Sequence, residues 1–397
     1  MIDVVGVSAR GWPDIPTPLQ TLIKRAEVVL GSPRHLKLVP AFAGQQREVW
    51  PSPLREGLTE LVARFPDRRI VALASGDPLV SGIGSTLVEI LGVSRVRIHT
   101  APSSVALARA RMGWADDSVE VIRLRGDDVD LVRRAIFPAR RLIILSRDSD
   151  SPAEIAAVLT QSGFGESRVT VLGDLDSDVE SRVDSLARDR HAAAPALNVV
   201  CVDCVGPGFG SLAPGLPDQA FDHDGQLTKR DVRASALAHL MPRPGQLLWD
   251  IGAGAGSIAI EWLRCHPSCR AVAVEQQIER AKRIQANARA LGVPGLSVVN
   301  AEAEDILDDL PRPDAVFIGG GSTWEMISRC WEALAGGGRM VVHSVTQETE
   351  MIMAHCRREH GGELTRISVE HLEPIGRYTG WQPARPVVQW SAIKESG

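Results

Sequence analysis

A chain of 397 residues is long enough for two or three domains that each bury a core of their own. Its 44% apolar and 23% charged residues are typical of a soluble globular protein, and a net charge of -5 without a basic stripe argues against a nucleic-acid-binding protein. No apolar run reaches the ~18 residues of a membrane span, and the N-terminus has the pattern of a strand rather than of a signal peptide. We therefore expect a cytoplasmic protein with no membrane or nucleic-acid partner.

The N-terminal half alternates between buried strands and helices. Residues 70–74 form a predicted strand that ends in Ser75-Gly76-Asp77-Pro78-Leu79. Residues 96–99 form another, which ends in Thr100-Ala101-Pro102-Ser103-Ser104 before an Ala-rich helix. Glycine and proline fix loops whose backbone a ligand can approach closely. Ser103 and Ser104 are equally suited to cap the helix and to contact a ligand, so both roles stay open.

These two strand ends together resemble the tetrapyrrole methylase family, in which two αβα lobes enclose S-adenosylmethionine in a cleft. The resemblance covers residues 1–205, with a second lobe that begins at about residue 116. It implies cofactor contacts at Asp77, Val80, Ser103 and Ser104. The chain departs from the family pattern in its N-terminal loop, which is not GxGPG-like, and at Ala101-Pro102, where Gly-Ile is usual.

Cysteine usage points away from metal chemistry. Six cysteines do not make a disulfide framework in so long a chain. Cys201 and Cys204 have chelate spacing, but they fall in a predicted strand, 197–205, where residues three apart point to opposite faces. No second CxxC follows, and we expect no metal site.

Residues 206–226 are rich in Gly, Pro and Asp and lack periodicity, so they are predicted to be a linker between two domains, 1–205 and 227–397. A helix opens directly after this stretch, with Thr228 as its expected N-cap. Lys229, Arg230 and Arg233 follow, and on the residues alone they can be a solvated basic face.

The C-terminal half contains the most informative stretch of the chain. A predicted strand, 247–251, stops at Gly252-Ala253-Gly254-Ala255-Gly256 and leads into a helix. Such a turn leaves bare backbone for a nucleotide-like ligand, although it can also be only a tight connection. A second strand, 270–274, ends at Glu275 about 20 residues beyond the glycines, where such folds place a carboxylate on ribose hydroxyls. A third strand, 296–299, is followed by Glu302 and Ala303.

The GxGxG spacing resembles the class I methyltransferases, which have a Rossmann-like fold and bind S-adenosylmethionine. The resemblance implies that residues 252–256 pass under the amino-acid part of the cofactor and that Glu275 holds the ribose. Glu302 and Ala303 would border the adenine, and Thr228 would be a further contact. The fourth strand ends in Gly319, Gly320 and Gly321, which suit a flat, wide substrate and equally suit a flexible turn.

Over almost its whole length the chain resembles the precorrin-6Y C5,15-methyltransferase (decarboxylating) family of cobalamin biosynthesis. The resemblance implies that precorrin-6B is methylated at C5 and C15 and loses carbon dioxide from the ring C acetate, which gives precorrin-8X. It also implies one S-adenosylmethionine site in each domain, with C15 methylation and decarboxylation in the C-terminal one. The substrate carries many carboxylates, which makes five basic side chains candidate clamps. These are Lys229, Arg230, Arg233, Arg377 and Arg385.

Two other interpretations remain, and the catalytic residues are not assigned. One alternative is a methyltransferase for another substrate such as RNA, and the other is a fusion whose N-terminal domain is not catalytic. We find no Ser-His-Asp set, no HExxH and no P-loop in the sequence. Transfer of an already activated methyl to an enamine-like carbon requires positioning rather than a dedicated nucleophile. Relatives of both domains form oligomers, so we expect a dimer or a tetramer.

Overall fold

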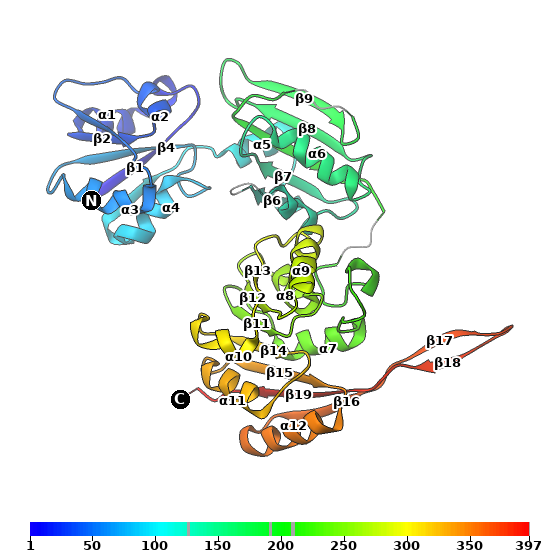
Figure 1. Ribbon diagram of the computed structural model, residues 1–397. Coiled ribbons are helices and arrows are strands. Elements are labelled where there is room, and N and C mark those ends of the chain that lie inside the picture. The colour runs from blue at the N-terminus through cyan, green and yellow to red at the C-terminus, as the bar shows by residue number, and fades with distance from the viewer. Residues whose placement is uncertain (125–127, 190–192, 208–210, 397) are drawn as a thin grey trace. The chain divides into compact units, whose positions relative to one another are not determined.

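The computed structural model describes residues 1–124, 128–189, 193–207 and 211–396 (Figure 1). By its internal contacts the chain divides into two units, Met1–Val129 with Phe137–Pro207, and Asp130–Ile136 with Gly208–Gly397. Each unit is built of sheets covered by helices, which confirms the predicted α/β class. The domain limits stay predictions, and residues 208–210 of the predicted linker lie outside the described residues.

The first sheet of the N-terminal unit is entirely parallel, in the order β3-β2-β4-β1-β5. Its strands are β1 (Ile2–Val7), β2 (Val28–Gly31), β3 (Gln46–Val49), β4 (Ile70–Ser75) and β5 (Val96–His99). Even-numbered residues of β4 pack with the helices α3 (Leu54–Ala63) and α4 (Ile83–Leu91). Odd-numbered ones pack with α1 (Thr17–Arg25) and α2 (Pro33–Lys37). Because both faces are covered, the carboxyl edge of the sheet is where a ligand can enter.

The second sheet of this unit is mixed, in the order β6-β7-β10-β8-β9. Its strands are β6 (Val119–Arg123), β7 (Arg141–Leu145), β8 (Arg168–Gly173), β9 (Ser181–Leu186) and β10 (Asn198–Asp203). The helices that accompany it are α5 (Ser104–Met112) and α6 (Ser151–Gln161). Strand β9 was not predicted, because it is mostly exposed and lacks an apolar pattern.

The C-terminal unit has one seven-stranded sheet, in the order β13-β12-β11-β14-β15-β19-β16. The strands β11 (Leu247–Ile251), β12 (Arg270–Val274), β13 (Ser297–Val299), β14 (Ala315–Ile318) and β15 (Arg339–Ser344) are parallel to one another. Strands β19 (Val387–Ile393) and β16 (Glu363–Ile367) complete it in antiparallel pairs.

Helices cover both faces of this sheet. One face packs against α7 (Arg230–Leu240), α8 (Ser257–Cys265) and α9 (Ile278–Ala290). The other packs against α10 (Ala303–Ile306), α11 (Trp324–Ala333) and α12 (Gln347–His360). The carboxyl ends of β11, β12, β13 and β14 therefore meet at one edge, which is the Rossmann-like arrangement expected from the glycine-rich stretch.

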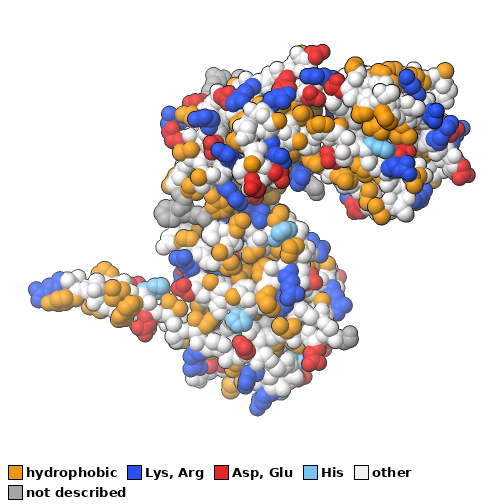
Figure 2. Space-filling view, turned by 180° about the vertical axis from the view of Figure 1, so that it is seen from behind, with side chains coloured by type: hydrophobic (Ala, Val, Ile, Leu, Met, Phe, Trp, Pro, Cys, Tyr) orange, Lys and Arg blue, Asp and Glu red, His pale blue; other side chains and the backbone are white. Residues whose placement is uncertain are grey.

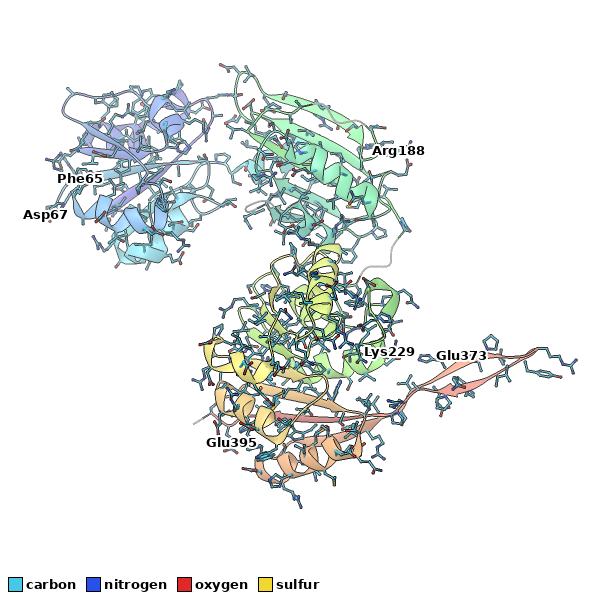
Figure 3. The ribbon with its side chains drawn as sticks, in the orientation of Figure 1. Phe65, Asp67, Arg188, Lys229, Glu373 and Glu395 are labelled. Carbon is cyan, nitrogen blue, oxygen red and sulfur yellow. The ribbon has the colours of Figure 1, made fainter. Side chains whose placement is uncertain are left out.

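A two-stranded ribbon projects from the C-terminal unit (Figure 1). It consists of β17 (Glu370–Ile375) and β18 (Tyr378–Pro383), and we call it the arm. Almost all of its residues are exposed, and Figure 2 shows hydrophobic side chains spread along it. In Figure 3, Glu373 marks the arm and Lys229 marks the start of α7. Among the described residues, none of the helices has the length and apolarity that crossing a bilayer requires.

Candidate functional site

The turn between β11 and α8 requires glycine at three of its positions. Gly252, Gly254 and Gly256 have φ angles of 68°, 60° and 75°, in the left-handed region that side chains disfavour. A Cβ on Gly256 would also lie 2.7 Å from Cγ2 of Ile284 in α9. The loop therefore offers bare backbone at the carboxyl edge of the sheet, as predicted for residues 252–256, with Ala253 and Ala255 between the glycines.

Glu275 is positioned at the loop by the backbone that surrounds it. Its Oε2 accepts a hydrogen bond from the N–H of Gly254 at 2.9 Å, and its Oε1 accepts one from Gln277 at 3.0 Å. The residue is 4% exposed, so the carboxylate can leave the edge only if these bonds break. Each oxygen keeps a second lone pair that can accept a hydrogen bond from a ribose hydroxyl.

Asn300 supports this arrangement, although sequence reasoning missed it. Its Nδ2 donates to the carbonyl oxygens of Glu275 at 2.8 Å and Gln276 at 2.9 Å, and so it joins the ends of β12 and β13. The signal that could have found it is its position, directly after a predicted strand beside the one that carries Glu275.

Asp250 is the strongest sign of a ligand at this edge. Its Oδ2 accepts from the N–H of Ala259 at 3.0 Å, whereas its buried Oδ1 has no hydrogen-bond partner among the described residues. Burial raises the pKa of Asp250 to about 7, with a smaller contribution from the nearby carboxylate of Glu275. A cationic amino group is the natural partner for such an atom, and S-adenosylmethionine carries one. The loop, Glu275 and Asp250 together fit that cofactor.

The remaining residues of this edge leave room beside the loop. Gly320 and Gly321 have no atom within 4 Å of a built Cβ, and the Cβ position of Gly252 lies 3.5 Å from the oxygen of Gly320. Glu302 is exposed before α10, and Ala303 is half-buried against the core at the first residue of that helix. These positions agree with an open rim, as expected for a wide substrate, and their contacts stay predictions.

Most of the stretch before α7 packs against the C-terminal unit. Leu216 and Phe221 are buried in the core of the C-terminal unit. Glu261 of α8 accepts the N–H groups of Gly215 at 2.6 Å and Leu216 at 3.0 Å. We use the name strap for residues 211–228. The lack of periodicity that suggested a linker arises because buried polar side chains, rather than a regular apolar pattern, hold this segment.

Asn287 of α9 connects the strap to the glycine loop. Its Oδ1 accepts from the N–H of Asp222, and its Nδ2 donates to the oxygen of Asp222, both at 2.9 Å. The same Nδ2 donates to the oxygen of Ala255 at 3.0 Å. The backbone oxygen of Gln226 lies 3.0 Å from the Cβ position of Gly254, which brings the strap against the loop.

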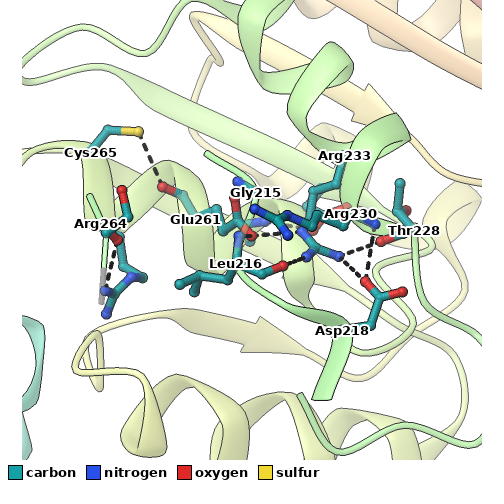
Figure 4. Close-up of polar contacts among 12 residues, drawn as sticks. Gly215, Leu216, Asp218, Thr228, Arg230, Arg233, Glu261, Arg264 and Cys265 are labelled. Carbon is teal, nitrogen blue, oxygen red and sulfur yellow. Dashed lines mark hydrogen bonds and ion pairs between the residues drawn. The ribbon is translucent and has the colours of Figure 1, made fainter. Parts of the chain in front are cut away.

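Two expectations for the start of α7 are wrong. Lys229, not Thr228, is the N-cap residue, and the Asp218 carboxylate instead accepts the N–H of Arg230 at 3.0 Å. Arg233 is fully buried rather than available to a substrate. Its guanidinium donates to Glu261 at 2.6 Å, to Asp218 at 3.3 Å and to two backbone oxygens (Figure 4).

Arg233 is buried because the strap supplies the oxygen atoms that its donors need, which the sequence pattern did not reveal. It therefore holds the strap in place. Lys229 and Arg230 are exposed and stay candidates, although Lys229 already lies 3.6 Å from Asp218.

The two candidate clamps near the C-terminus belong to the arm and to the segment that follows it. Arg377 occupies the turn of the arm, where its guanidinium stacks over the Tyr378 ring at 5.1 Å. Arg385 is exposed between β18 and β19. The turn between β17 and β18 lies at the far end of the arm, away from β11 and α8 (Figure 1).

The N-terminal unit has a second edge of close backbone contacts. A Cβ on Gly6, near the end of β1, would lie 1.9 Å from the oxygen of Gly76, and one on Gly76 would lie 2.6 Å from the oxygen of Pro102. The ends of β1, β4 and β5 therefore meet. Oδ1 of Asp77 accepts the N–H of Leu79 at 2.8 Å and shapes the turn after β4.

The other three expected contacts of this edge have local roles in the structure. Ser103 is the N-cap of α5 and accepts from Ala106 at 3.1 Å, and Ser104 is the first residue of that helix. Val80 packs against the core of the second sheet. Capping is thus observed for Ser103, and contact with a cofactor stays a prediction for all four residues.

Cys201 and Cys204 are both buried thiols, in β10 and directly after it. Burial raises the pKa of each thiol to about 12, so both stay protonated. Among residues 1–124, 128–189, 193–207 and 211–396, no group of three or more His, Cys, Asp and Glu could hold a metal ion.

Comparison with known proteins finds a related family for each half of the chain. Residues 1–183 match the tetrapyrrole (corrin/porphyrin) methylases, and residues 219–394 match the precorrin methyltransferase domain. A precorrin-6Y C(5,15)-methyltransferase (decarboxylating) of Sinorhizobium sp is 41% identical over 99% of this chain and 96% of its own length.

Two shorter proteins are also similar. A probable cobalt-precorrin-6B C(15)-methyltransferase (decarboxylating) of Saccharolobus solfataricus is 36% identical over 35% of this chain and 73% of its own length. The crystal structure of the C-terminal domain of precorrin-6Y C5,15-methyltransferase from Rhodobacter capsulatus is 45% identical. It covers 46% of this chain and 100% of that domain, with a TM-score of 0.45. Given the full-length similarity, this chain belongs to the precorrin-6Y C5,15-methyltransferase (decarboxylating) family of S-adenosylmethionine-dependent methyltransferases.

Proposed function

We propose that the chain converts precorrin-6B to precorrin-8X, by methylation at C5 and C15 and loss of carbon dioxide from the ring C acetate. The observation that carries the proposal is the 41% identity over both units to a protein of that name. Among the residues that the structure describes, no feature favours an RNA substrate or a non-catalytic N-terminal unit.

We further propose that each unit holds one S-adenosylmethionine. In the C-terminal unit, Glu275 accepts the ribose hydroxyls, Oδ1 of Asp250 faces the amino group, and the Gly252–Gly256 backbone lies under the amino-acid part. In the N-terminal unit, the loops around Gly76 and Ser103 form the corresponding edge. The cofactor supplies an activated methyl on its sulfonium, so the chain contributes binding, orientation and exclusion of water.

The C-terminal unit is assigned to C15 methylation and decarboxylation, and the N-terminal unit to C5. Support comes from the Saccharolobus protein, which is shorter than this chain and whose name includes C15 methylation and decarboxylation but not C5. Loss of carbon dioxide leaves an electron pair that the conjugated macrocycle can accept. We further propose that Lys229 and Arg230 hold other carboxylates of the substrate, and that Gly319, Gly320 and Gly321 border it.

The test uses the full chain with precorrin-6B and S-adenosylmethionine, followed by mass analysis. The wild type should add two methyl groups and release one carbon dioxide. Glu275→Ala should add one methyl without release of carbon dioxide, whereas Asp77→Ala should slow only the other methylation. Equilibrium dialysis should give two bound cofactors per wild-type chain and one per Glu275→Ala chain. If Glu275→Ala still released carbon dioxide at the wild-type rate, the assignment would be wrong.

We also propose that the chain forms a dimer or tetramer in the cytoplasm, with the arm in the contact between copies. Leu372, Ile375, Tyr378 and Trp381 are each more than half exposed on the arm. A lone two-stranded ribbon is marginally stable in water, so a second copy of the chain is the partner that its apolar side chains fit.

A further inference from the structure

Arg34 is an exposed arginine at the carboxyl edge of the first sheet, next to the expected cofactor contacts. It belongs to α2, the short helix that follows β2, and Ser75 ends β4, which is the neighbour of β2 in the sheet. Nη2 of Arg34 donates to the hydroxyl oxygen of Ser75 at 2.6 Å. Because Ser75 directly precedes Gly76 and Asp77, this bond places the guanidinium beside the loop that follows β4.

The hydrogen bonds of Arg34 end on neutral groups. Its Nη2 also lies 3.0 Å from Nε2 of His35, which must accept because a guanidinium can only donate. Nδ1 of the same ring then carries the hydrogen and donates to the hydroxyl of Ser32 at 3.0 Å. Burial, followed by the adjoining Arg34 guanidinium, lowers the pKa of His35 to about 4, so the imidazole is a neutral acceptor at neutral pH. The hydroxyl of Ser75 lies 2.8 Å from the same Nε2, and the two residues hold the guanidinium between them.

The charge of Arg34 is not neutralised by a carboxylate of the protein. Among the residues that the structure describes, Arg34 has no ion pair within 4.0 Å, and its Nε and Nη1 have no hydrogen-bond partner. Partial burial lowers the pKa of Arg34, and the charge of Asp174, directly after β8, opposes this effect, so the side chain stays charged. By contrast Arg10, which follows β1, lies 3.8 Å from Asp176. Arg34 therefore keeps its charge and the N–H groups of Nε and Nη1 for a ligand.

A carboxylate is the ligand that this arrangement fits. A guanidinium forms charge-assisted hydrogen bonds with a carboxylate, and one that is already oriented by its neighbours loses little side-chain freedom when it binds. The carboxyl edge of such a sheet is also where ligands enter. In the proposed reaction, both the macrocycle and the amino-acid part of S-adenosylmethionine carry carboxylates.

We propose that Arg34 binds a ligand carboxylate at the carboxyl edge of the N-terminal unit, with His35 and Ser75 as positioning residues that hold its guanidinium. The inference rests on the proposed function, in which this unit methylates C5 of the macrocycle. Arg34 orients the ligand and takes no part in a bond-making step. The macrocycle and the cofactor are the two sources of the carboxylate, and they predict different measurements.

The test measures the methylation that remains in a Glu275→Ala background, where only the N-terminal unit is expected to transfer a methyl. Arg34→Gln removes the charge, and Arg25→Gln is its matched control. Arg25 is also exposed, but it ends α1 before β2 begins, so it lies at the opposite, amino edge of the sheet. Calorimetry on the same chains measures cofactor affinity without turnover.

The two sources of the carboxylate affect different constants. Contact with the macrocycle predicts that Arg34→Gln raises the KM for precorrin-6B by about 10- to 100-fold, while kcat and cofactor affinity change little. Contact with the cofactor predicts that the Kd for S-adenosylmethionine rises by this factor instead. Arg25→Gln should match its parent in both measurements. If Arg34→Gln leaves both constants unchanged, the inference is overturned.

A double-mutant cycle tests the positioning role. Ser75→Ala removes one of the two acceptors of Nη2 and should raise the same constant as Arg34→Gln, by about 3- to 10-fold. In the Arg34→Gln chain, Ser75→Ala should have no further effect, because the guanidinium that it holds is gone. His35→Leu, which offers no acceptor, should follow the same pattern. Effects of equal size with and without Arg34 would refute the positioning role.

Failure of this inference can be told apart from failure of the proposed function. The Cβ position of Gly76 lies 2.6 Å from the oxygen of Pro102, so Gly76→Val should abolish the remaining methylation if this edge performs it, with circular dichroism as the check on folding. If Gly76→Val is inactive while Arg34→Gln keeps both constants, the role of Arg34 is refuted and the proposed function stands. If Gly76→Val folds and stays active, the assignment of the unit itself is wrong.

Discussion

Single side chains at the C-terminal edge combine structural and binding roles. Glu275 fixes the glycine loop through the N–H of Gly254 and still has lone pairs for a ligand. One carboxylate oxygen of Asp250 accepts a hydrogen bond from the N–H of Ala259 in α8, and the other has no hydrogen-bond partner among the described residues. In both cases the carboxylate cannot be replaced by a side chain of the same size without the loss of an acceptor.

The first prediction concerns Glu275. In the wild type, each carboxylate oxygen of Glu275 accepts a hydrogen bond from a backbone N–H. In Glu275→Gln the amide NH₂ replaces one of these oxygens and faces a backbone N–H, so one charge-assisted hydrogen bond is lost. We expect cofactor affinity at this site to fall by about 10- to 100-fold, which corresponds to about 1.5–3 kcal/mol. Calorimetric titration measures the change. Glu279→Gln, on the exposed side of α9, is the control and should bind as the wild type does.

The second prediction concerns Asp250 and pH. Its folded pKa of about 7 lies above the usual 3.8, so the folded state binds more protons than the unfolded state between these values. The contribution of Asp250 to stability is therefore fully present below about pH 4 and is lost as pH rises through 7.

Asp250→Asn removes this dependence, so its melting temperature relative to the wild type should rise from pH 5 to pH 8. Thermal unfolding of the cofactor-free protein at both pH values provides the measurement. A difference between the two proteins that is the same at pH 5 and pH 8 would contradict the prediction.

At the scale of elements, helix α9 lies so close to the glycine loop that position 256 has no room for a side chain. Ile284 of α9 packs where a Cβ of Gly256 would lie, and Asn287 of the same helix bonds the loop and the strap. The helix thus sets the position of the loop from behind while the strap borders it at Gly254. Residues 226, 254 and 287 are distant in the chain, and only the packed unit places them together.

The third prediction follows for Gly256→Ala. Its Cβ would meet Ile284 at 2.7 Å, and the φ of 75° is strained for alanine, so we expect a loss of stability of about 1–3 kcal/mol and weaker cofactor binding. Denaturant unfolding and calorimetry measure the two effects. Gly295→Ala is the matched control, because no atom lies within 4 Å of its built Cβ. Equal effects of the two substitutions would show that the loop tolerates side chains.

At the scale of the whole molecule, the arm is notable because the rest of the C-terminal unit does not pack against its side chains. Leu372 and Trp381 are directly paired across the two strands and are 56% and 66% exposed. An exposed pair of this size on a ribbon with free edges fits an interface better than a solvated surface.

The fourth prediction is that Leu372→Asn combined with Trp381→Ser lowers the molar mass in solution to that of a monomer. Light scattering after size-exclusion chromatography measures it, and Glu373→Gln on the same arm should leave the mass unchanged. Because no arm residue belongs to the core of the C-terminal unit, the double substitution should change the melting temperature of that unit only slightly. A wild type that is already monomeric would refute the assembly role.

The sequence by itself determined the α/β class and the family resemblance. It also determined that the glycine loop and Glu275 lie at the ends of two strands. These are local features, because glycine spacing, strand-end residues and apolar runs act over a few neighbouring positions. The tertiary structure alone decided that Arg233 is buried, that residues 211–228 pack as a strap, and that the ribbon projects from the C-terminal unit. It alone joined His35 to Ser75 and Asn287 to Ala255. Such contacts depend on which strands and helices become neighbours in the folded unit. Residue patterns along the chain do not specify these neighbours.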